Sequence, residues 1–399
     1  MVWVAMVNER LALLRDYPFR RLNSLLSGLQ APGDKEELIM SIGEPQHPYP
    51  DFVKNVLADN ADLWGKYPPT PGTAELRRSI ADWLIGRYGL ESTNMDPEKN
   101  ILPVAGTREA LFSVALMATP QNTHSNRPTV LMPDPFYQIY SGAAIMAGAE
   151  PVYVPTSEKN GFLPDLGNVP DCQLQRASLA YICSPSNPQG AAATNEQFIR
   201  YVEMARSYNF VLAVDECYSE IYFGKPLCGV LEACAQMNGR YSNVLAFHSL
   251  SKRSNVPGLR SGFVAGDNEL IKAFGQLREY TGNASPGPVL AVATALWNDE
   301  DHVQINRRLY KEKFKDAETL LGKHPDFYKP DGGFYLWLKV GDGEAITRTL
   351  WEEAGIKVMP GKYLSREDGD APGAPYIRVA LVHSRHKTAE GLRRIAALL

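Results

Sequence analysis

The chain of 399 residues is poor in cysteine, and its five cysteines form no CxxC pair. An odd number without such spacing is typical of reduced thiols in a cytosolic protein, not of a disulfide framework or a zinc site. The N-terminal run of residues 1–7 (MVWVAMV) is apolar, but no basic residue precedes it and no small-residue cleavage site follows it. We therefore expect no signal peptide and a cytoplasmic location.

Blocks of basic residues are also absent, and the net charge is −4. Such a chain lacks the positive surface that neutralises a nucleic-acid backbone, so a nucleic-acid partner is not expected. No GxxxxGK[ST] motif and no apolar run long enough to cross a membrane occur. With 44% hydrophobic and 22% charged residues, the composition is that of an ordinary folded protein. Its length predicts a large domain and a smaller one.

Short apolar runs alternate with segments of helical spacing between about residues 100 and 266. The predicted strands are residues 101–104, 129–132, 151–154, 179–183, 210–214, 243–247 and 262–265. Residues 109–118 and 195–208 have the apolar spacing of helices. This alternation predicts an α/β fold with a mainly parallel sheet flanked by helices.

The pattern changes after residue 287. A long charged helix is predicted over residues 288–321, interrupted near 297–301, and strand-like runs follow at 333–338 (GFYLWL) and 376–382 (YIRVALV). These features predict a smaller α+β domain. We therefore divide the chain into an N-terminal arm with part of the small domain (1–50), a large domain (51–287) and a C-terminal small domain (288–399).

Lys252 lies in the segment FHSLSKRSNVPGLRSG, residues 247–262, just after a predicted strand. Ligands of open α/β sheets bind at this edge. A lysine held there with a lowered pKa can capture a carbonyl group. Arg260, eight positions later, offers a planar fork that suits a phosphate. The alternative is a polar turn with an exposed lysine.

Asp215 directly follows the predicted strand 210–214, so its carboxylate lies at the same edge of the sheet. A carboxylate in that place needs a cation, and a protonated pyridine nitrogen is one. A Walker-B-like metal ligand is the alternative, but the P-loop that should accompany it is missing.

The segment VAGTREA, residues 104–110, runs from a strand into a helix. The free N–H groups of Gly106, Thr107 and Arg108 can bind an anion there. Many strand–helix turns contain glycine, so the motif is weak alone. Together with Arg260 it provides two donors for one phosphate.

Three further residues lie at predicted strand exits. Tyr137 in PDPFY presents a ring on which a flat heterocycle can stack, although it can equally be a core residue. Asn187 in SPSNPQG can donate to a phenolate oxygen. Tyr218, three positions after Asp215, can share that oxygen or contact the lysine.

Arg378 lies inside an apolar strand-like run, so it must be paired if it is buried. A substrate carboxylate or a structural Asp or Glu would serve. Tyr67 in YPPTPG, taken locally, belongs to a proline-rich helix entry, and Gly43 belongs to IGEP. His383 and His386 form an HxxH without a third ligand nearby, so we expect no metal site.

In this order, and over nearly the whole chain, these segments resemble the fold-type-I (class I and II) aminotransferases, which use pyridoxal 5′-phosphate (PLP). The resemblance implies a large PLP-binding domain with a mainly parallel seven-stranded sheet. Lys252 is then the residue that forms the internal aldimine and shuttles the proton. Asp215 pairs with the pyridine nitrogen, and Asn187 and Tyr218 contact the ring oxygen.

The resemblance also assigns the remaining residues. Tyr137 stacks on the ring, and Arg378, near Gly43 and Asn187, binds the substrate α-carboxylate. A tyrosine matching Tyr67 reaches the phosphate from the neighbouring subunit, which implies a homodimer with shared active sites. The other residues that the resemblance assigns to the phosphate are Gly106, Thr107, Ser249 and Arg260.

Several segments are similar to the bacterial N-succinyldiaminopimelate aminotransferases of lysine biosynthesis. They are Tyr17-Pro18-Phe19, SIGEPQHP, VAGTREAL, PDPFYQIY, DECYSE and FHSLSKRSNVPGLRSGFVAGD. That similarity implies ping-pong transfer between N-succinyl-LL-2,6-diaminopimelate and 2-oxoglutarate. Gln189, where threonine is usual, and the loop 280–288 depart from the pattern and put the substrate in doubt.

Two kinds of alternative remain open. One is another PLP enzyme: an aminotransferase for aspartate, N-acetylornithine or aromatic substrates, or a β-lyase. The other is a non-catalytic sensor of a transcription regulator. Only 16 residues precede Tyr17, too few for a helix-turn-helix, and the intact Lys252 favours chemistry.

Overall fold

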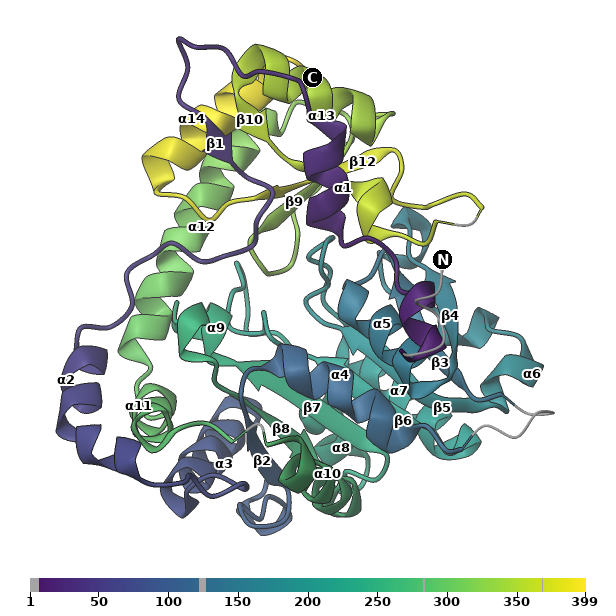
Figure 1. The fold of residues 1–399 in the computed structure, drawn as a ribbon, viewed down its shortest axis with the longest axis vertical. Coiled ribbons are helices and arrows are strands. Elements are labelled where there is room, and N and C mark those ends of the chain that lie inside the picture. The colour runs from purple at the N-terminus through teal and green to yellow at the C-terminus, as the bar shows by residue number, and fades with distance from the viewer. Residues whose placement is uncertain (1–6, 122–126, 283, 368) are drawn as a thin grey trace.

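The computed structural model describes residues 7–121, 127–282, 284–367 and 369–399. Residues 1–6 of the apolar N-terminal run, and Asn283 of the loop 280–288, lie outside these ranges. The described chain forms a large sheet covered by helices and, beside it, a smaller layer of short strands and helices (Figure 1).

The large sheet has seven strands in the described part of the chain. Their spatial order is β2 (Ile101–Val104), β8 (Gly262–Gly266), β7 (Val244–Ser249), β6 (Val211–Asp215), β5 (Ala177–Cys183), β3 (Thr129–Asp134) and β4 (Glu150–Pro155). Every pairing is parallel except the two made by β8. The predicted mainly parallel sheet of seven strands is confirmed.

Side chains of the central strands alternate between two cores. On β6, Leu212 and Val214 face one cluster of buried residues, and Val211 and Ala213 face the other. Strands that are covered on both faces read as continuous apolar runs, which is why they were recognisable in the sequence.

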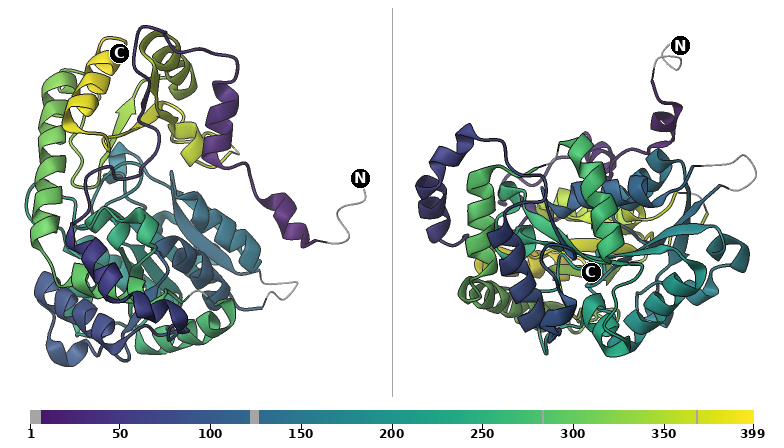
Figure 2. Two further views of the ribbon diagram at one scale, coloured as in Figure 1. Left: turned by 60° about the vertical axis from the view of Figure 1, so that its left-hand side comes forward. Right: turned by 90° about the horizontal axis from the view of Figure 1, so that it is seen from below.

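Helices cover both faces of the sheet (Figure 2). The first core includes residues of α3 (Ala74–Tyr88), α7 (Asn195–Tyr208), α8 (Val230–Met237) and α11 (Gly287–Trp297). The second includes residues of α4 (Thr107–Ala118), α5 (Gln138–Ala147) and α10 (Asn268–Thr281). The short helices α2 (Phe52–Asp59), α6 (Asp171–Leu174) and α9 (Leu250–Arg253) complete this part.

The smaller layer joins the two ends of the chain. Its antiparallel sheet has the order β11 (Met359–Pro360), β12 (Tyr376–Ala380) and β9 (Tyr335–Lys339), and β1 (Leu38–Ile39) pairs in parallel with β10 (Ile356–Lys357). The helices α1 (Pro18–Leu25), α12 (Asp301–Leu321), α13 (Gly343–Ala354) and α14 (Arg385–Ala396) surround these strands (Figure 1). Residues near 40 therefore lie beside residues near 360.

The limits of the two domains stay a prediction. The β1–β10 pair supports assigning part of the N-terminal arm to the small domain. α11 packs against α2 and α3 of the large part, although the predicted limit at 287 places it in the small one. We propose that the second limit lies between α11 and α12.

The strands β5, β6 and β7 are parallel, so their carboxyl ends meet at one edge of the sheet. The small layer faces this edge, and the space between them is where a ligand is expected. No helix in the described ranges is both long and apolar enough to cross a membrane.

Candidate active site

A cavity of about 370 Å³ lies at this edge, a size typical of small-molecule sites. The predicted residues that line it are Gly43, Thr107, Arg108, Tyr137, Asn187, Asp215, Tyr218, Ser249, Lys252, Arg260 and Arg378. Residues spread over more than 330 positions of the chain are thus brought together. Tyr67 is fully exposed and is not part of the lining.

Lys252 projects into the cavity from α9. Its Nζ donates to the carbonyl oxygen of Gly43 at 2.6 Å. Burial, as the largest cause, lowers the pKa of Lys252 to about 8, and the positive charges of Arg378 and Arg260 act in the same direction. The exposed polar turn considered above is therefore excluded. A lysine amine with this pKa is partly neutral near pH 7 and can act as a nucleophile or a base.

Asp215 ends β6 and lies on the cavity wall, only 5% exposed. It accepts hydrogen bonds from the Tyr140 hydroxyl at 2.8 Å and from the Cys217 backbone N–H at 3.2 Å. Burial is the main cause that raises the pKa of Asp215. No lysine or arginine of the described residues pairs with this carboxylate. A cationic ring nitrogen beside it would compensate its desolvation.

The anion end of the cavity is built where α4 begins. Gly106 caps this helix with φ 85°, in the left-handed region that favours glycine. A Cβ at Gly106 would lie 2.2 Å from Arg260 Nη2, so the guanidinium lies directly over the glycine. Ser249, which caps α9, lines the same cavity. This arrangement joins a helix N-terminus, a hydroxyl and a guanidinium around one space, as a phosphate requires.

Arg378 also lines the cavity; it lies on β12 and is 5% exposed. Its Nη1 donates to Asn187 Oδ1 at 2.9 Å and its Nη2 to the Ser41 carbonyl at 2.8 Å. Its guanidinium lies 4.4 Å from the centre of the Tyr335 ring. No ion pair among the described residues includes Arg378, so the structural Asp or Glu considered above is not found there. A ligand carboxylate would supply the missing charge.

Two tyrosines and another arginine, Arg108, form a further part of the cavity wall. Arg108 donates through Nε to the Tyr137 hydroxyl at 2.8 Å and through Nη2 to the Tyr17 hydroxyl at 2.5 Å. Burial raises the pKa of the Tyr137 hydroxyl well above its usual value, so it stays protonated. Tyr137 therefore lines the cavity and is no ordinary core residue.

Tyr335, Tyr140 and Cys217 are among the residues of the site that were not predicted from the sequence. Tyr335 lines the cavity, and its hydroxyl lies 3.4 Å from that of Tyr218; a Cβ at Gly43 would lie only 1.7 Å from the same hydroxyl. Tyr140 and Cys217 surround Asp215. Tyr335 lies within an apolar strand-like run, so no pattern singled it out. Tyr140 follows Tyr137 by three positions, the spacing of one helix face, and that spacing was a usable signal.

The HxxH pair has an ordinary setting. His383 Nε2 lies 3.0 Å from the carbonyl oxygen of Ile39. Within the described ranges, no group of three His, Cys, Asp or Glu side chains is placed to hold a metal ion.

Comparisons with known proteins agree with this geometry. Residues 35–395 match the model of the family "Aminotransferase class I and II". The chain is 31% identical to the LL-diaminopimelate aminotransferases of Syntrophobacter fumaroxidans and Aquifex aeolicus, over 98% of both chains in each case. It is 41% identical to a solved aminotransferase of Neisseria meningitidis, with a TM-score of 0.94 over 98% of this chain and 100% of that one. A solved aminotransferase AspB of Helicobacter pylori is 34% identical, with a TM-score of 0.87 over 96% of this chain and 98% of that one.

The chain therefore belongs to the class I and II aminotransferase family, and the predicted family is confirmed. Its cofactor is PLP. The residues present fit that group: a side chain in place of Gly106 would fill the space under the Arg260 guanidinium, and the buried Asp215 has no lysine or arginine partner among the described residues. PLP supplies the electron-withdrawing ring that makes the substrate Cα proton acidic.

Proposed function

We propose that this aminotransferase moves an amino group between N-succinyl-LL-2,6-diaminopimelate and 2-oxoglutarate in a ping-pong reaction. One observation carries the amino-transfer chemistry. The amine of Lys252, whose pKa burial lowers to about 8, shares a cavity with Arg378, a buried guanidinium without a carboxylate partner in the described chain. An amino acid presents to such a cavity both a carboxylate and a Cα proton next to its amine.

Each residue then has a task in the reaction. Arg378 binds the α-carboxylate and fixes the orientation of the substrate. Lys252 would remove the Cα proton and later return a proton. Asp215 would keep the ring nitrogen of PLP protonated, and Asn187 and Tyr218 would bind the ring oxygen. Thr107, Ser249 and Arg260 hold the phosphate.

The charges of the cavity favour a substrate with a distal carboxylate. Arg108 is a cation on the wall, and Gln138 is a neutral polar neighbour in the lining. Among the described lining residues Asp215 is the one acid, and it is assigned to the cofactor. The distal end of N-succinyldiaminopimelate carries carboxylates and an amide in place of an ammonium. Such a group needs no acidic partner, whereas a free distal ammonium would.

A second candidate substrate is LL-diaminopimelate without the succinyl group. The curated relatives that match at 28–31% identity are named LL-diaminopimelate aminotransferase. Both candidates belong to the same biosynthetic chemistry and differ in the charge of the distal nitrogen.

The deciding experiment is single-turnover conversion of the PLP holoenzyme to its amine form, followed by absorbance. We expect N-succinyl-LL-2,6-diaminopimelate to react at least about tenfold faster than LL-diaminopimelate, aspartate, N-acetylornithine or alanine, since an unpaired distal charge costs binding energy. Arg108→Gln should reduce that preference, and a Gln138→Ala control should reduce it less. A faster reaction of LL-diaminopimelate would favour the second candidate. No reaction with any amino acid would refute amino transfer.

We also propose that the chain acts as a cytoplasmic homodimer in which Tyr67 reaches the partner's phosphate site. Supporting this, Tyr67 is fully exposed, and Trp64 in the same segment and Leu11 and Leu13 in the N-terminal 3₁₀ helix η1 (Glu9–Leu13) are about half exposed. Figure 2 shows η1 at the margin of the molecule. Sedimentation should give twice the chain mass. Tyr67→Phe should weaken PLP binding without changing that mass, and a monomeric active enzyme would refute the proposal.

A further inference from the structure

The helix that carries Lys252 is too short to satisfy its own backbone. α9 spans four residues, so its last carbonyl groups have no partner within the helix. The carbonyl oxygens of Lys252 and Arg253 instead accept hydrogen bonds from Asn306 Nδ2, at 3.1 and 3.4 Å. Asn306 belongs to α12 and is 3% exposed. A side chain of another helix therefore holds the backbone from which Lys252 projects.

The amide of Asn306 is itself oriented by His47. Asn306 Oδ1 lies 2.8 Å from His47 Nδ1. Because Asn306 Nδ2 donates to two carbonyls, its Oδ1 is the acceptor, so Nδ1 of His47 carries the hydrogen. Burial, assisted by the charge of Lys313, lowers the pKa of His47 to about 4. The imidazole is thus a neutral donor near pH 7, and its buried Nε2 has no hydrogen-bond partner in the described chain.

His47 belongs to the same segment that contacts the amine of Lys252. Gly43, four positions before His47, accepts from Lys252 Nζ, and Ser41 accepts from Arg378 Nη2. Residues 41–47 therefore contact the carboxylate-binding arginine, the amine of Lys252 and, through Asn306, the backbone of Lys252. These contacts form a closed ring around Lys252.

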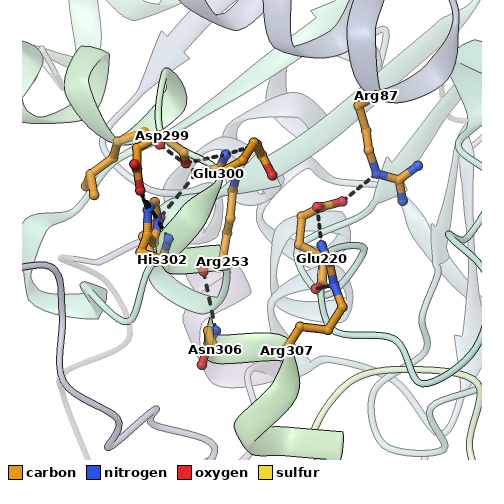
Figure 3. A network of polar contacts seen from close by, with 10 residues as sticks. Arg87, Glu220, Arg253, Asp299, Glu300, His302, Asn306 and Arg307 are labelled. Atoms are coloured by element: carbon orange, nitrogen blue, oxygen red, sulfur yellow. Dashed lines mark hydrogen bonds and ion pairs between the residues drawn. The ribbon is translucent and has the colours of Figure 1, made fainter. Parts of the chain in front are cut away.

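A second set of contacts fixes α9 from behind, as Figure 3 shows. His302, one turn before Asn306 on α12, has its Nε2 2.8 Å from Ser254 Oγ. Arg253 donates to the carbonyl oxygen of Leu296, in α11, at 2.7 Å. α9 and its C-cap residue, Ser254, are thus bound to two successive turns of α12 and to the end of α11. Among these residues of α11 and α12, Asn306 is the one that donates a hydrogen bond to the backbone of Lys252 itself.

We propose that Asn306 is a positioning residue for Lys252. It fixes the position of the lysine amine relative to the substrate through the contacts that join Asn306, His47, residues 41–47 and Lys252. This inference rests on the catalytic role proposed for Lys252. Asn306 touches neither cofactor nor substrate: it lies outside the cavity lining and acts through the backbone of α9.

The test compares Asn306→Ala and Asn306→Asp with Gln304→Ala, an exposed residue of the same helix, in the PLP holoenzyme. Aspartate keeps the size of Asn306 but cannot donate to the two carbonyls. Both Asn306 variants should lower kcat about tenfold with KM changed less than threefold, because a small displacement of the reacting group affects the chemical step. They should also shift the pH midpoint of the visible absorbance of bound PLP by about half a unit or more. Gln304→Ala should leave both values unchanged.

His47→Phe provides an independent variant. Phenylalanine preserves the ring that packs against Tyr310 and removes the one hydrogen that His47 donates to Asn306. It should shift the absorbance midpoint in the same direction by a smaller amount. The double variant His47→Phe/Asn306→Ala should behave like Asn306→Ala alone, since coupled residues are not additive.

Two results would overturn the inference. In the first, the Asn306 variants lose thermal stability but keep the kcat and the absorbance midpoint of the unmodified enzyme. That result would mean that Asn306 has only a structural role. The other, decisive if the Asn306 variants do not fold, is His47→Phe with an unchanged midpoint. If the unmodified protein shows no amino transfer, the proposed function fails separately. Acetylation of Lys252 in the full chain without PLP, measured against exposed Lys225, then tests whether Asn306→Ala changes the reactivity of the lysine.

Discussion

The regions in front of Lys252 and behind it each contain a buried arginine, and the two are held differently. Behind the lysine, Arg253 is 2% exposed, lies over the Trp83 and Trp297 rings and forms an ion pair with Glu300 (Figure 3). In front, Arg378 is 5% exposed and donates only to neutral oxygens of the protein in the described ranges. A guanidinium with its own carboxylate supports the fold, whereas one that faces a cavity with neutral acceptors is ready for a ligand carboxylate.

Two lysines with lowered pKa values repeat this contrast. Burial lowers the pKa of Lys252 to about 8 and that of Lys313 to about 7. Lys252 lines the cavity, while Lys313 donates to the Leu381 carbonyl at 2.9 Å and is not part of the lining. A lowered pKa alone therefore does not mark a catalytic lysine, and the cavity makes the distinction.

The largest expected effect comes from Lys252→Ala. We expect amino transfer to fall about 10⁴-fold or more, because the proton-transfer group and the covalent link to PLP are lost together. The visible absorbance that bound PLP owes to its covalent link with Lys252 should be lost. Lys313→Met is the matched control and should keep kcat within a few-fold at pH 8. Equal losses in the two variants would contradict the contrast between the lysines.

Arg378→Lys and Arg378→Met should lower kcat/KM for amino acids about 10²–10³-fold, with lysine the milder change, because a bidentate charged contact to the carboxylate is lost. Steady-state kinetics with each half-reaction measures this. In Arg378→Met the free energy of unfolding should stay level or rise, since an uncompensated buried charge is removed. If an amine that lacks the α-carboxylate loses as much rate, Arg378 does not act on the carboxylate.

Arg253→Met should have the opposite profile. We expect a loss of about 3 kcal/mol in the free energy of unfolding, at the low end for a broken buried pair because the partly exposed Glu300 can be hydrated. Urea unfolding of the PLP-free chain measures it. A variant as stable as the unmodified protein would show that the Arg253 cluster does not support the fold.

Sequence reasoning reached the part of the site that comes from strand ends. Asp215, Lys252 and Asn187 each follow a buried apolar run. Parallel strands place such residues at one edge of the sheet, independently of the conformation of the loops. The seven strands were recognisable for the same reason. The unpredicted parts depend on contacts between distant segments: Arg378 donates to Ser41, 337 positions away, and Asn306 supports Lys252 from another helix. No local pattern encodes such contacts, because they join segments that only the folded chain brings together.

The smallest and most specific prediction concerns the pH dependence of stability. Because burial lowers the pKa of Lys313 to about 7, the unfolded chain binds more protons at this residue than the folded chain between about pH 7 and 10. Stability should therefore rise with pH in that window, by up to about 1.4 kcal/mol per pH unit from this lysine. Lys252 contributes in the same direction above pH 8 in the PLP-free chain, so the difference between Lys313→Met and the unmodified chain isolates Lys313.

Urea unfolding of both PLP-free chains from pH 7 to 9 measures that difference. The advantage of methionine should be largest at pH 7 and shrink as the pH rises, because folding of the unmodified chain releases a proton from Lys313 and this release costs less free energy at higher pH. A difference that stays constant with pH would mean that Lys313 keeps an ordinary pKa when folded. Of the two lysines, only Lys252 would then have a pKa that burial lowers.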